Sequence, residues 1–386
     1  MNENLKKPRI LFVVNVDWFF LSHRLPLALE AKRRGYDVFV AAGDTGRGED
    51  MEKNGLKYIP LDIVRNRISV GEAIKNIWQL IRIFRKVKPD LVHLVTGKPI
   101  LYGNIARVFY KKIPVVNALT GLGALFSYDE KRHSLLKSIV TTLYRISLSY
   151  DKSLTIFQNS YDVDQFISNN LISREKAVLI RGSGVDIDQF SYSEEVISEK
   201  PIVLFASRLI WDKGIQEFVE ASRILRQEHP EIRFVIVGKP DIENSQAVPE
   251  SVLQQWNEEG VIEWPGFCSN MRELIAEASL VVLPTYYPEG VPKILIEAAA
   301  CGRAIIASDI PGCREIVEDG SNGILVEPKN SEELADKIQY LLQNPEVRTS
   351  MGKRGRQKVL ESFSLKQVIK ETFACYEKLL NRETNS

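Results

Sequence analysis

Two glutamates frame the stretch "PEGVPKILIE", residues 288–297, and their spacing could serve chemistry. The preceding "LVVLPT" (280–285) is typical of a buried strand, and Pro292 fits the first turn of a helix that continues through "KILIEAAACG". Glu289 then lies in the loop and Glu297 in the second helical turn, beside Ile296 and three alanines. A carboxylate in that apolar setting needs a donor, such as a sugar hydroxyl. Three readings stay open: an acid/base pair, a surface glutamate plus a capping one, or two arms on one polar ligand.

Two cations follow another predicted strand in "ASRLIWDKGI", residues 206–215. Arg208 ends the strand, and Lys213 comes five positions later, before a glycine and a helix-like run. An Arg fork and a Lys point charge at a strand-to-helix turn suit a diphosphate. The alternative is a pair of solvated surface cations. Further along, "WPGF" places Gly266 and Phe267 in a turn where backbone could approach a flat nucleobase, although a plain turn explains it equally well.

The first half offers polar residues that could line a cleft on the side of a second substrate. Asp17, His23 and Arg24 follow the first predicted strand, and Thr120 and Gly121 follow a later one in "NALTGLGALFS" (117–127). Neither this segment nor "AAGDTGRG" (41–48) completes the G-x-G-x-x-G fingerprint, which weighs against a nicotinamide oxidoreductase. No D-x-D pair suggests a metal site, because "DID" (186–188) falls in a predicted linker, and we expect a metal-independent protein without a cofactor.

The elements that would position these residues are short apolar runs alternating with helix-like stretches. A first series comprises 9–16, 37–43, 91–97 and 115–119, with helices expected at 25–34 and 70–87, and a second comprises 201–208, 233–239, 261–266, 280–285 and 304–309. Two successive β-α-β series predict an α/β protein of two doubly wound domains, joined by the glycine-containing stretch 180–190 and followed by a helix over 364–381. We place the domains at 1–185 and 186–364, with 365–386 packing back on the first.

Length and composition agree with two ordinary globular domains. The chain has 386 residues, 44% of them hydrophobic and 26% charged. The start of the sequence does not resemble a signal peptide, and no apolar run approaches the roughly 18 residues that span a bilayer. Four scattered cysteines predict free thiols and a cytoplasmic location.

Charge is divided unevenly between the halves. Residues 1–190 carry 29 Lys and Arg against 19 Asp and Glu, a net +10, and the remainder carries 22 against 31, a net −9. Basic and apolar residues mix in the segments 82–89, 109–114 and 133–150. They could form a surface for an anionic membrane, although each is by itself typical of an ordinary packed helix.

The ordered set Arg208, Lys213, Glu289 and Glu297 closely resembles that of the retaining family 4 glycosyltransferases, whose GT-B fold consists of two facing Rossmann-like domains. "EGVPKILIE" is similar to their E-x7-E motif, "SRLIWDKGI" to their R-x4-K segment and "RGSGVDIDQF" to their interdomain stretch. The resemblance implies that the second domain binds a nucleotide-diphosphate sugar and that the first binds the acceptor. Arg208 and Lys213 would hold the diphosphate, Glu297 the ribose and Glu289 the transferred sugar. The backbone of Gly290 and Val291, ahead of Pro292, would approach the sugar and the distal phosphate.

More narrowly, "SHRLP", "TGLG" and "SRLIWDKGI" resemble bacterial transferases that add a hexosamine to polyprenyl-diphosphate-linked sugars in glycan and lipopolysaccharide O-antigen assembly. This implies a UDP-linked hexose or N-acetylhexosamine as donor, a lipid-linked saccharide as acceptor, no nucleic acid, and a peripheral location on the inner face of the cell membrane. The sequence departs from the family in "NVDWFFLSHR", which has no glycine after the first strand, and in lacking a clear cleft histidine near "LTGLGA".

The resemblance implies front-face attack with retention, in which the leaving phosphate helps to deprotonate the acceptor. Three other readings compete. A glycosidase also uses two carboxylates but leaves the two cations unexplained. A nucleotide-sugar epimerase on the same two-domain fold would need no acceptor. A membrane-bound adaptor without catalysis would need no donor site.

Overall fold

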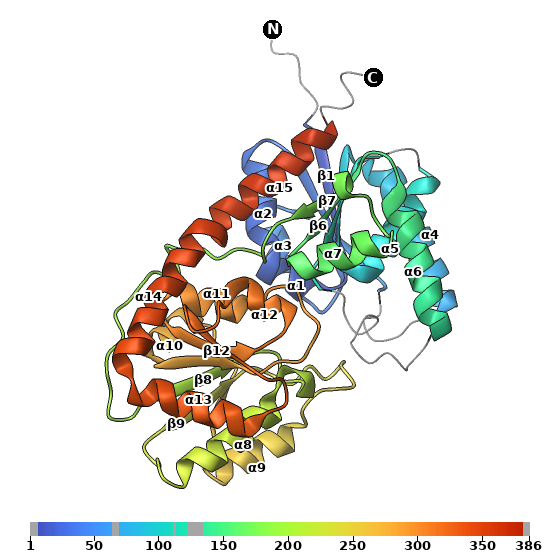
Figure 1. Ribbon diagram of the computed structural model, residues 1–386. Coiled ribbons are helices and arrows are strands. Elements are labelled where there is room, and N and C mark those ends of the chain that lie inside the picture. The colour runs from blue at the N-terminus through green and yellow to red at the C-terminus, as the bar shows by residue number, and fades with distance from the viewer. Residues whose placement is uncertain (1–6, 64–68, 111–112, 122–133, 381–386) are drawn as a thin grey trace. The chain divides into compact units, whose positions relative to one another are not determined.

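The computed structural model describes residues 7–63, 69–110, 113–121 and 134–380, and only the backbone of 134–139 (Figure 1). The chain divides into two compact units, Met1–Ile180 with Ile369–Ser386, and Arg181–Val368. Each unit is built around one parallel sheet with helices on both faces, as the alternation of apolar runs and helical stretches predicts.

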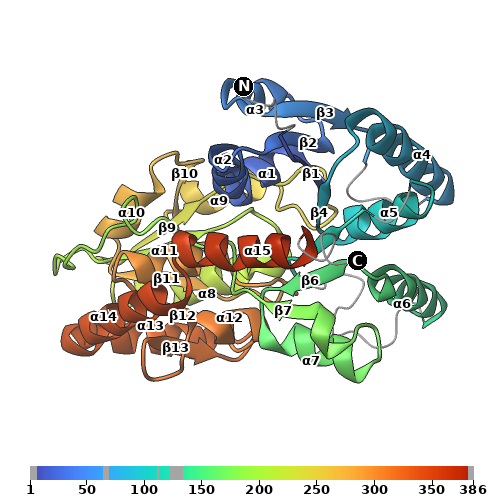
Figure 2. The same cartoon turned by 90° about the horizontal axis from the view of Figure 1, so that it is seen from above.

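The first unit contains a seven-stranded sheet of order β3-β2-β1-β4-β5-β6-β7, and Figure 2 shows β3, β2, β1 and β4 in succession. Its strands are β1 (Arg9–Val14), β2 (Asp37–Gly43), β3 (Lys57–Leu61), β4 (Leu91–Val95), β5 (Val115–Leu119), β6 (Ser153–Phe157) and β7 (Ala177–Leu179). The strands β4, β5 and β6 are buried along their whole length, which explains their unbroken runs of mostly apolar residues.

Helices α4, α5 and α6 pack side by side in this unit (Figure 1). Its helices are α1 (Asp17–His23), α2 (Leu25–Arg33), α3 (Gly48–Lys53), α4 (Val70–Val87), α5 (Gly97–Val108), α6 (Ser134–Ser149), α7 (Ser160–Ser168) and the short η2 (Arg174–Lys176). The last helix, α15 (Leu365–Leu380), also contributes its part from Ile369 onward. Arg34, at the end of α2, lies over the Phe373 ring at 3.9 Å and pairs with Glu377 at 3.5 Å.

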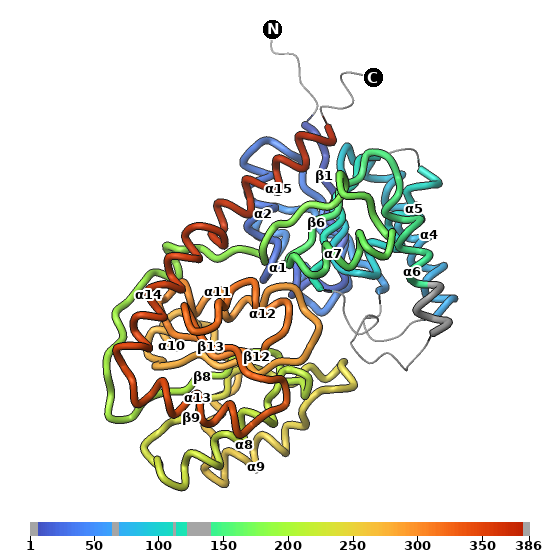
Figure 3. The backbone as a smooth tube through the Cα atoms, in the orientation of Figure 1, coloured from blue at the N-terminus to red at the C-terminus, as the bar shows by residue number. Residues whose placement is uncertain are grey.

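The second unit contains a six-stranded parallel sheet of order β10-β9-β8-β11-β12-β13. Its strands are β8 (Ile202–Ala206), β9 (Arg233–Val237), β10 (Glu263–Gly266), β11 (Leu280–Leu283), β12 (Ala304–Ser308) and β13 (Gly323–Val326). Its helices are η3 (Trp211–Lys213), α8 (Ile215–Arg226), α9 (Glu250–Glu258), α10 (Met271–Glu277), α11 (Lys293–Ala300), α12 (Pro311–Ile316), α13 (Ser331–Gln343) and α14 (Pro345–Ser362). Figure 3 shows α11 and α12 on one side of this sheet, and α8, α9 and α13 on the other.

Sequence reasoning found every strand of both sheets except β3, β6, β7 and β13. The stretch 180–190, expected as a linker, is partly core: Val185 and Phe190 are buried in the second unit, and Val185 forms a bridge with Ser364. All four cysteines are free thiols, as expected.

Candidate functional site

The strand order of the second unit reverses between β8 and β11. Strands β9 and β10 extend the sheet on one side of β8, and β11, β12 and β13 extend it on the other. The loops that leave β8 and β11 therefore diverge, and such a topological switch point is where doubly wound sheets bind ligands. Arg208 and Lys213 follow β8, and Glu289 follows β11. The topology thus brings the two quoted motifs to one place.

Gly214 allows the loop after β8 to lie directly against the loop after β11. Its φ is +78°, and a Cβ built there would lie 2.0 Å from the carbonyl oxygen of Pro284. A larger residue would push the two loops apart. The backbone N–H of Tyr286 also donates to the carbonyl of Asp212 at 3.0 Å. This close contact between the loops fixes Lys213 next to Glu289.

Lys213 and Glu289 form an ion pair through Nζ and Oε1. Their side chains are 7% and 17% exposed, so the pair is largely removed from water. Burial lowers the pKa of Lys213, and the Glu289 charge acts in the opposite direction. The Thr285 hydroxyl donates to the carbonyl of Asp212 at 3.2 Å and reaches Glu289 Oε1 at 3.4 Å. Glu289 Oε1 thus accepts from the Lys213 ammonium and faces the Thr285 hydroxyl.

Arg208 lies in the same loop and is more open than Lys213. Its Nη1 donates to Asp241 Oδ2 at 2.8 Å, and its side chain is 34% exposed. The Tyr287 ring faces both cations, with its centroid 5.9 Å from the Arg208 guanidinium carbon and 5.2 Å from Lys213 Nζ. Two cations, each paired with a carboxylate, therefore lie at the switch point around one aromatic ring.

The loop from Glu289 to Pro292 is packed from below by α12. A Cβ at Gly312 would lie 1.9 Å from the carbonyl oxygen of Gly290. Val291 is buried, and Pro292 is the N-cap residue of α11, one position before the helix starts. This packing sets the backbone around Gly290, the segment that the family resemblance assigns to the sugar and phosphate.

Glu297 lies in the second turn of α11, as predicted, and is buried. Its donor in this structure is Lys293, one turn earlier, at 3.1 Å. Burial raises the pKa of Glu297, and Lys293 opposes that shift. The expectation that this carboxylate needs a donor therefore holds, and a residue of the same helix supplies it.

Gly266 and Phe267 lie at the carboxyl end of β10. Gly266 has a φ of +82°, a conformation that favours glycine, and its carbonyl accepts from Gly238 at 3.0 Å. Phe267 is exposed, and Lys239 Nζ lies 5.5 Å from its ring centroid. The turn thus presents an aromatic face and a cation, at the same sheet edge as Arg208.

In the first unit, Asp17 is buried and its carboxylate is occupied. It accepts from the N–H and hydroxyl of Thr45 at 2.7 and 2.5 Å, and from the N–H of Arg47 at 3.0 Å. These bonds favour a role in holding the loop after β2. His23 Nδ1 lies 2.6 Å from the Ser22 hydroxyl, and its ring stacks on Phe19 at 4.2 Å.

Arg24 belongs to a buried cluster rather than to an open loop. Burial lowers its pKa to about 10, and Tyr376 of α15 is the neighbour that opposes the shift. The Tyr376 hydroxyl lies 2.5 Å from Nδ1 of His93, whose pKa burial holds well below its usual value. Thr120 and Gly121 follow β5 and are half-buried, while Gly123 lies outside the described residues.

Sequence reasoning missed Asp241, Thr285 and Tyr287 as neighbours of the two cations. Thr285 and Tyr287 flank the quoted loop, and Asp241 follows β9, so their places after strands were a usable signal. Over the described residues, no cluster of three His, Cys, Asp or Glu could hold a metal ion. Among the helices that the structure describes, none is long and apolar enough to cross a membrane.

Comparisons with known proteins agree with this arrangement. Residues 9–160 match the model of the glycosyl transferase 4-like family, and residues 186–358 match that of glycosyl transferases group 1. The chain is 29% identical, over 89% of its length and 93% of the relative's, to the N,N'-diacetylbacillosaminyl-diphospho-undecaprenol alpha-1,3-N-acetylgalactosaminyltransferase of Campylobacter jejuni. It is 25% identical to the putative glycosyltransferase EpsD of Bacillus subtilis, over 97% of this chain and 98% of that one.

A solved structure extends the likeness to the fold. HepE of Anabaena, crystallised in complex with UDP and glucose, superposes with a TM-score of 0.75 at 19% identity, covering 95% of this chain and 99% of that one. The two family models cover strands β1 to β6 of the first sheet and all of the second, and the predicted GT-B architecture is confirmed. The chain is therefore a glycosyltransferase with the GT-B fold, whose first half matches the glycosyl transferase 4-like model and whose second half matches the glycosyl transferases group 1 model.

Proposed function

We propose that this glycosyltransferase moves a hexose or N-acetylhexosamine from a UDP-linked donor to a lipid-linked saccharide, with retention at the anomeric carbon, in bacterial surface polysaccharide or glycan assembly. The observation that carries the proposal is the pairing of Lys213 with Glu289 beside Arg208 at the switch point of the second sheet. The Campylobacter relative, named for a diphospho-undecaprenol acceptor, supports the acceptor class. The Anabaena complex with UDP supports the nucleotide.

In the proposed donor complex, Arg208 and Lys213 bind the diphosphate. When the bond to the sugar breaks, the distal phosphate of UDP gains one negative charge, and preorganised cations stabilise that charge without a metal. A donor phosphate would take some of the Arg208 N–H donors that now face the Asp241 carboxylate. The guanidinium has five N–H donors and can therefore bind two anions at once.

The two glutamates would bind the two sugars of the donor, the transferred sugar and the ribose. Glu289 would accept from hydroxyls of the transferred sugar while Lys213 turns toward the phosphate, and Glu297 would accept from the ribose hydroxyls. Gly290 and Val291 would approach the sugar through their backbone, and Gly266 with Phe267 would face the base. The bond from the anomeric carbon to the phosphate oxygen breaks, the bond to the acceptor oxygen forms on the same face, and the acceptor proton passes to the departing phosphate.

The first unit is the proposed acceptor domain. Of the residues suggested by sequence, Thr120, Gly121 and His23 lie in loops or at a helix end after the strands, and they are retained in the proposal. Asp17 would act by holding the loop after β2, and Arg24 through the buried cluster with Tyr376, since the contacts of both are internal. The enzyme would work at the inner face of the cell membrane.

The test combines purified enzyme with a panel of radiolabelled nucleotide sugars and membranes that carry lipid-linked saccharides. We expect transfer from one UDP-sugar, lost in Lys213→Ala and Glu289→Ala, with Lys353→Ala and Glu332→Ala as matched exposed controls on α14 and α13. Wild-type turnover in either site variant would refute the assignment. Product analysis by NMR decides retention against inversion. Incubation with donor alone tests the alternative, an epimerase on the same two-domain fold, which would convert the sugar without an acceptor.

A further inference from the structure

Helix α4 of the first unit presents an aligned apolar stripe to solvent. Val70, Ile74 and Trp78 are 78%, 52% and 55% exposed, and they recur every four residues. Residues four apart lie on one side of a helix, so the three form a continuous row over its first turns. Single exposed apolar residues are ordinary, but an aligned row with an aromatic at its end is a contact surface.

Cations border this row. Lys75, Arg82, Arg85 and Lys86 are exposed on α4, and within the described residues no hydrogen bond or ion pair engages the last three. Lys75 pairs with Asp62 at 2.9 Å. At about 100° per residue, the exposed positions from 70 to 86 fall within one arc of about 160°. Glu72, the acidic residue of α4, is half-buried, so this arc of the helix carries no exposed carboxylate.

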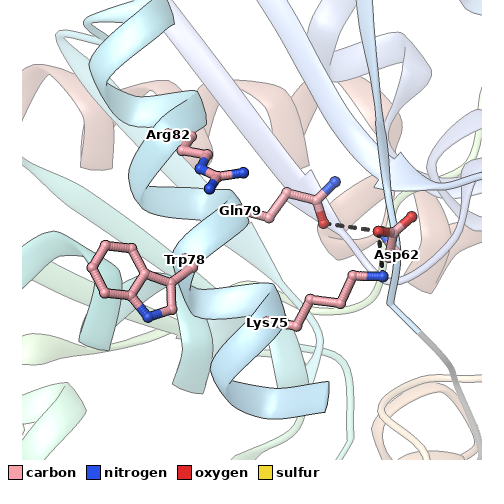
Figure 4. Close-up of a pocket in the computed structure, with 5 residues that line it drawn as sticks. All are labelled: Asp62, Lys75, Trp78, Gln79 and Arg82. Carbon is pink, nitrogen blue, oxygen red and sulfur yellow. Dashed lines mark hydrogen bonds and ion pairs between the residues drawn. The ribbon is translucent and has the colours of Figure 1, made fainter. Parts of the chain in front are cut away.

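A hollow of about 540 Å³ opens beside the row, where the chain leaves β3. It is lined by Asp62, Lys75, Trp78, Gln79 and Arg82 (Figure 4). Gln79 closes its floor by bonding the carbonyl of Pro60 and the N–H of Asp62, both at 3.2 Å. In Figure 4 Trp78 projects from the helix on one side while Arg82 and Lys75 extend on the other. A cation and an aromatic ring thus share the rim of this recess.

The row also lies at a particular edge of the unit. Helix α4 follows β3, so its first turns are near the carboxyl ends of the parallel strands. The loops after β1 and β5, which carry the proposed acceptor residues, leave the sheet at that same edge. A binding surface at that edge would lie next to the proposed acceptor residues.

We propose that the exposed face of α4, defined by Val70, Ile74, Lys75, Trp78, Arg82, Arg85 and Lys86, docks on a bilayer containing anionic lipids. The apolar row enters the boundary between headgroups and acyl chains, and Trp78 occupies the interfacial depth that tryptophan favours. The cations meet lipid phosphates, and the recess at Arg82 accepts a headgroup phosphate. Charge complementarity selects this occupant. Asp62, the exposed carboxylate at the recess, is paired with Lys75, and Arg82, Arg85 and Lys86 leave the face net positive, which fits an extended anionic surface. The purpose of docking rests on the proposed lipid-linked acceptor, but the docking itself is measured without any sugar.

The test is co-sedimentation of the full chain with vesicles of phosphatidylcholine alone or mixed with phosphatidylglycerol. We expect binding to the mixed vesicles that weakens at high salt, and little binding to phosphatidylcholine alone. Each basic residue near an anionic surface is worth about fivefold in partition, so Arg82→Gln with Arg85→Gln should lower binding about 30-fold. Ile74→Gln with Trp78→Gln should lower it about tenfold or more, since binding scales with buried apolar area.

Matched controls are Ile242→Gln, an exposed aliphatic in the second unit, and Lys353→Gln, an exposed cation on α14, and both should bind like wild type. The proposal is overturned if wild type fails to bind mixed vesicles, or if the α4 variants bind as well as wild type. Self-association that is abolished by Trp78→Gln, without vesicle binding, would also overturn it and assign the face to a second copy. An activity assay separates the docking proposal from the proposed function. Variants that fail to dock should still transfer sugar to a water-soluble saccharide acceptor. If wild type fails to transfer sugar to that acceptor, the result counts against the proposed function alone.

Discussion

Breaking the pair between Lys213 and Glu289 should separate the stability of the second unit from its activity. Removing one partner of a buried ion pair costs about 3–5 kcal/mol, because the other charge stays buried without compensation. Lys213 is 7% exposed and Glu289 17%, so water reaches the carboxylate more easily than the ammonium. We therefore expect Lys213→Met to cost about 3 kcal/mol and Glu289→Leu, which strands the more deeply buried charge, about 4 kcal/mol or more.

These costs can be measured by calorimetry. For a unit of 150–250 residues, about 3 kcal/mol lowers Tm by roughly 6–12 °C. The double variant Lys213→Met with Glu289→Leu removes both charges and should recover most of that loss, since apolar side chains often replace buried pairs at no cost. Titration with UDP should nevertheless show weakened binding in all three variants, and transfer should be lost in all three.

The decisive comparison is the double variant against the singles. Recovery of Tm without recovery of transfer would show that the pair is maintained for its chemistry and not for the fold. Two results would refute the reasoning: single variants whose Tm stays within 1–2 °C of wild type, corresponding to roughly 0.5 kcal/mol, or a double variant that transfers sugar at the wild-type rate.

Three further predictions follow from the packing and the titrating groups. Gly312→Ala should lower stability by about 2 kcal/mol or more and weaken UDP binding, because its Cβ would lie 1.9 Å from the Gly290 carbonyl, whereas Gly71→Ala in the exposed first turn of α4 should be neutral or stabilising by about 0.5 kcal/mol. Both are read from urea unfolding curves. Burial raises the pKa of Glu297, so its effect on stability is favourable only at low pH and is lost as pH rises through the folded pKa. Glu297→Gln should accordingly raise Tm relative to wild type at pH 8 and not at pH 4, and an equal effect at both would contradict the sign. For His93 the folded pKa is depressed, so the unfolded chain binds the proton more readily and stability falls as pH drops below about 6.5, by at most about 1.4 kcal/mol per pH unit. His93→Gln should reduce that slope in urea titrations between pH 7 and 5, and an unchanged slope would exclude His93 as its source.

The cluster of Arg208, Lys213 and Glu289 was predictable because these residues follow short, fully buried apolar strands in a fixed order. Arg208 lies in the loop after β8 and Glu289 in the loop after β11, and these two strands are adjacent at the switch point. A parallel sheet brings the carboxyl ends of neighbouring strands together, so strand order alone places these loops side by side. The sequence could not provide the partner of every charged residue in the cluster. Lys293 as donor to Glu297 follows from helical spacing, but the contact of Asp241 with Arg208 depends on how the loop after β9 folds.

Three of the four unpredicted strands lack a clear strand pattern in their residues, whereas β6 is a fully buried run of five residues that was not predicted. β3 carries Pro60 and mixes exposed with half-buried positions, so it lacks both a clean alternation and a buried run. β7 is three residues long and half-buried at the sheet edge, and β13 begins at Gly323. Arg24 was placed in a cleft by its position after the first strand, but its buried contact with Tyr376 comes from a helix more than 300 residues later in the chain. Such long-range packing leaves no local signal in the sequence.

The contacts of Glu289 and Glu297 distinguish these two glutamates from an acid/base pair. A general acid needs a raised pKa and a general base needs an unengaged lone pair, each aimed at the same bond. Burial raises the pKa of Glu297, as a general acid requires, but Glu297 is engaged by Lys293 on its own helix and Glu289 is engaged by Lys213. Each carboxylate is therefore compensated by its own cation, from a different element. Two separately neutralised carboxylates suit hydrogen bonding to neutral hydroxyls, because the ligand can replace the cation's N–H donors without a change in net charge at the site. These contacts support the proposed role, in which both glutamates bind one nucleotide sugar, over proton transfer between the glutamates and a glycosidic bond.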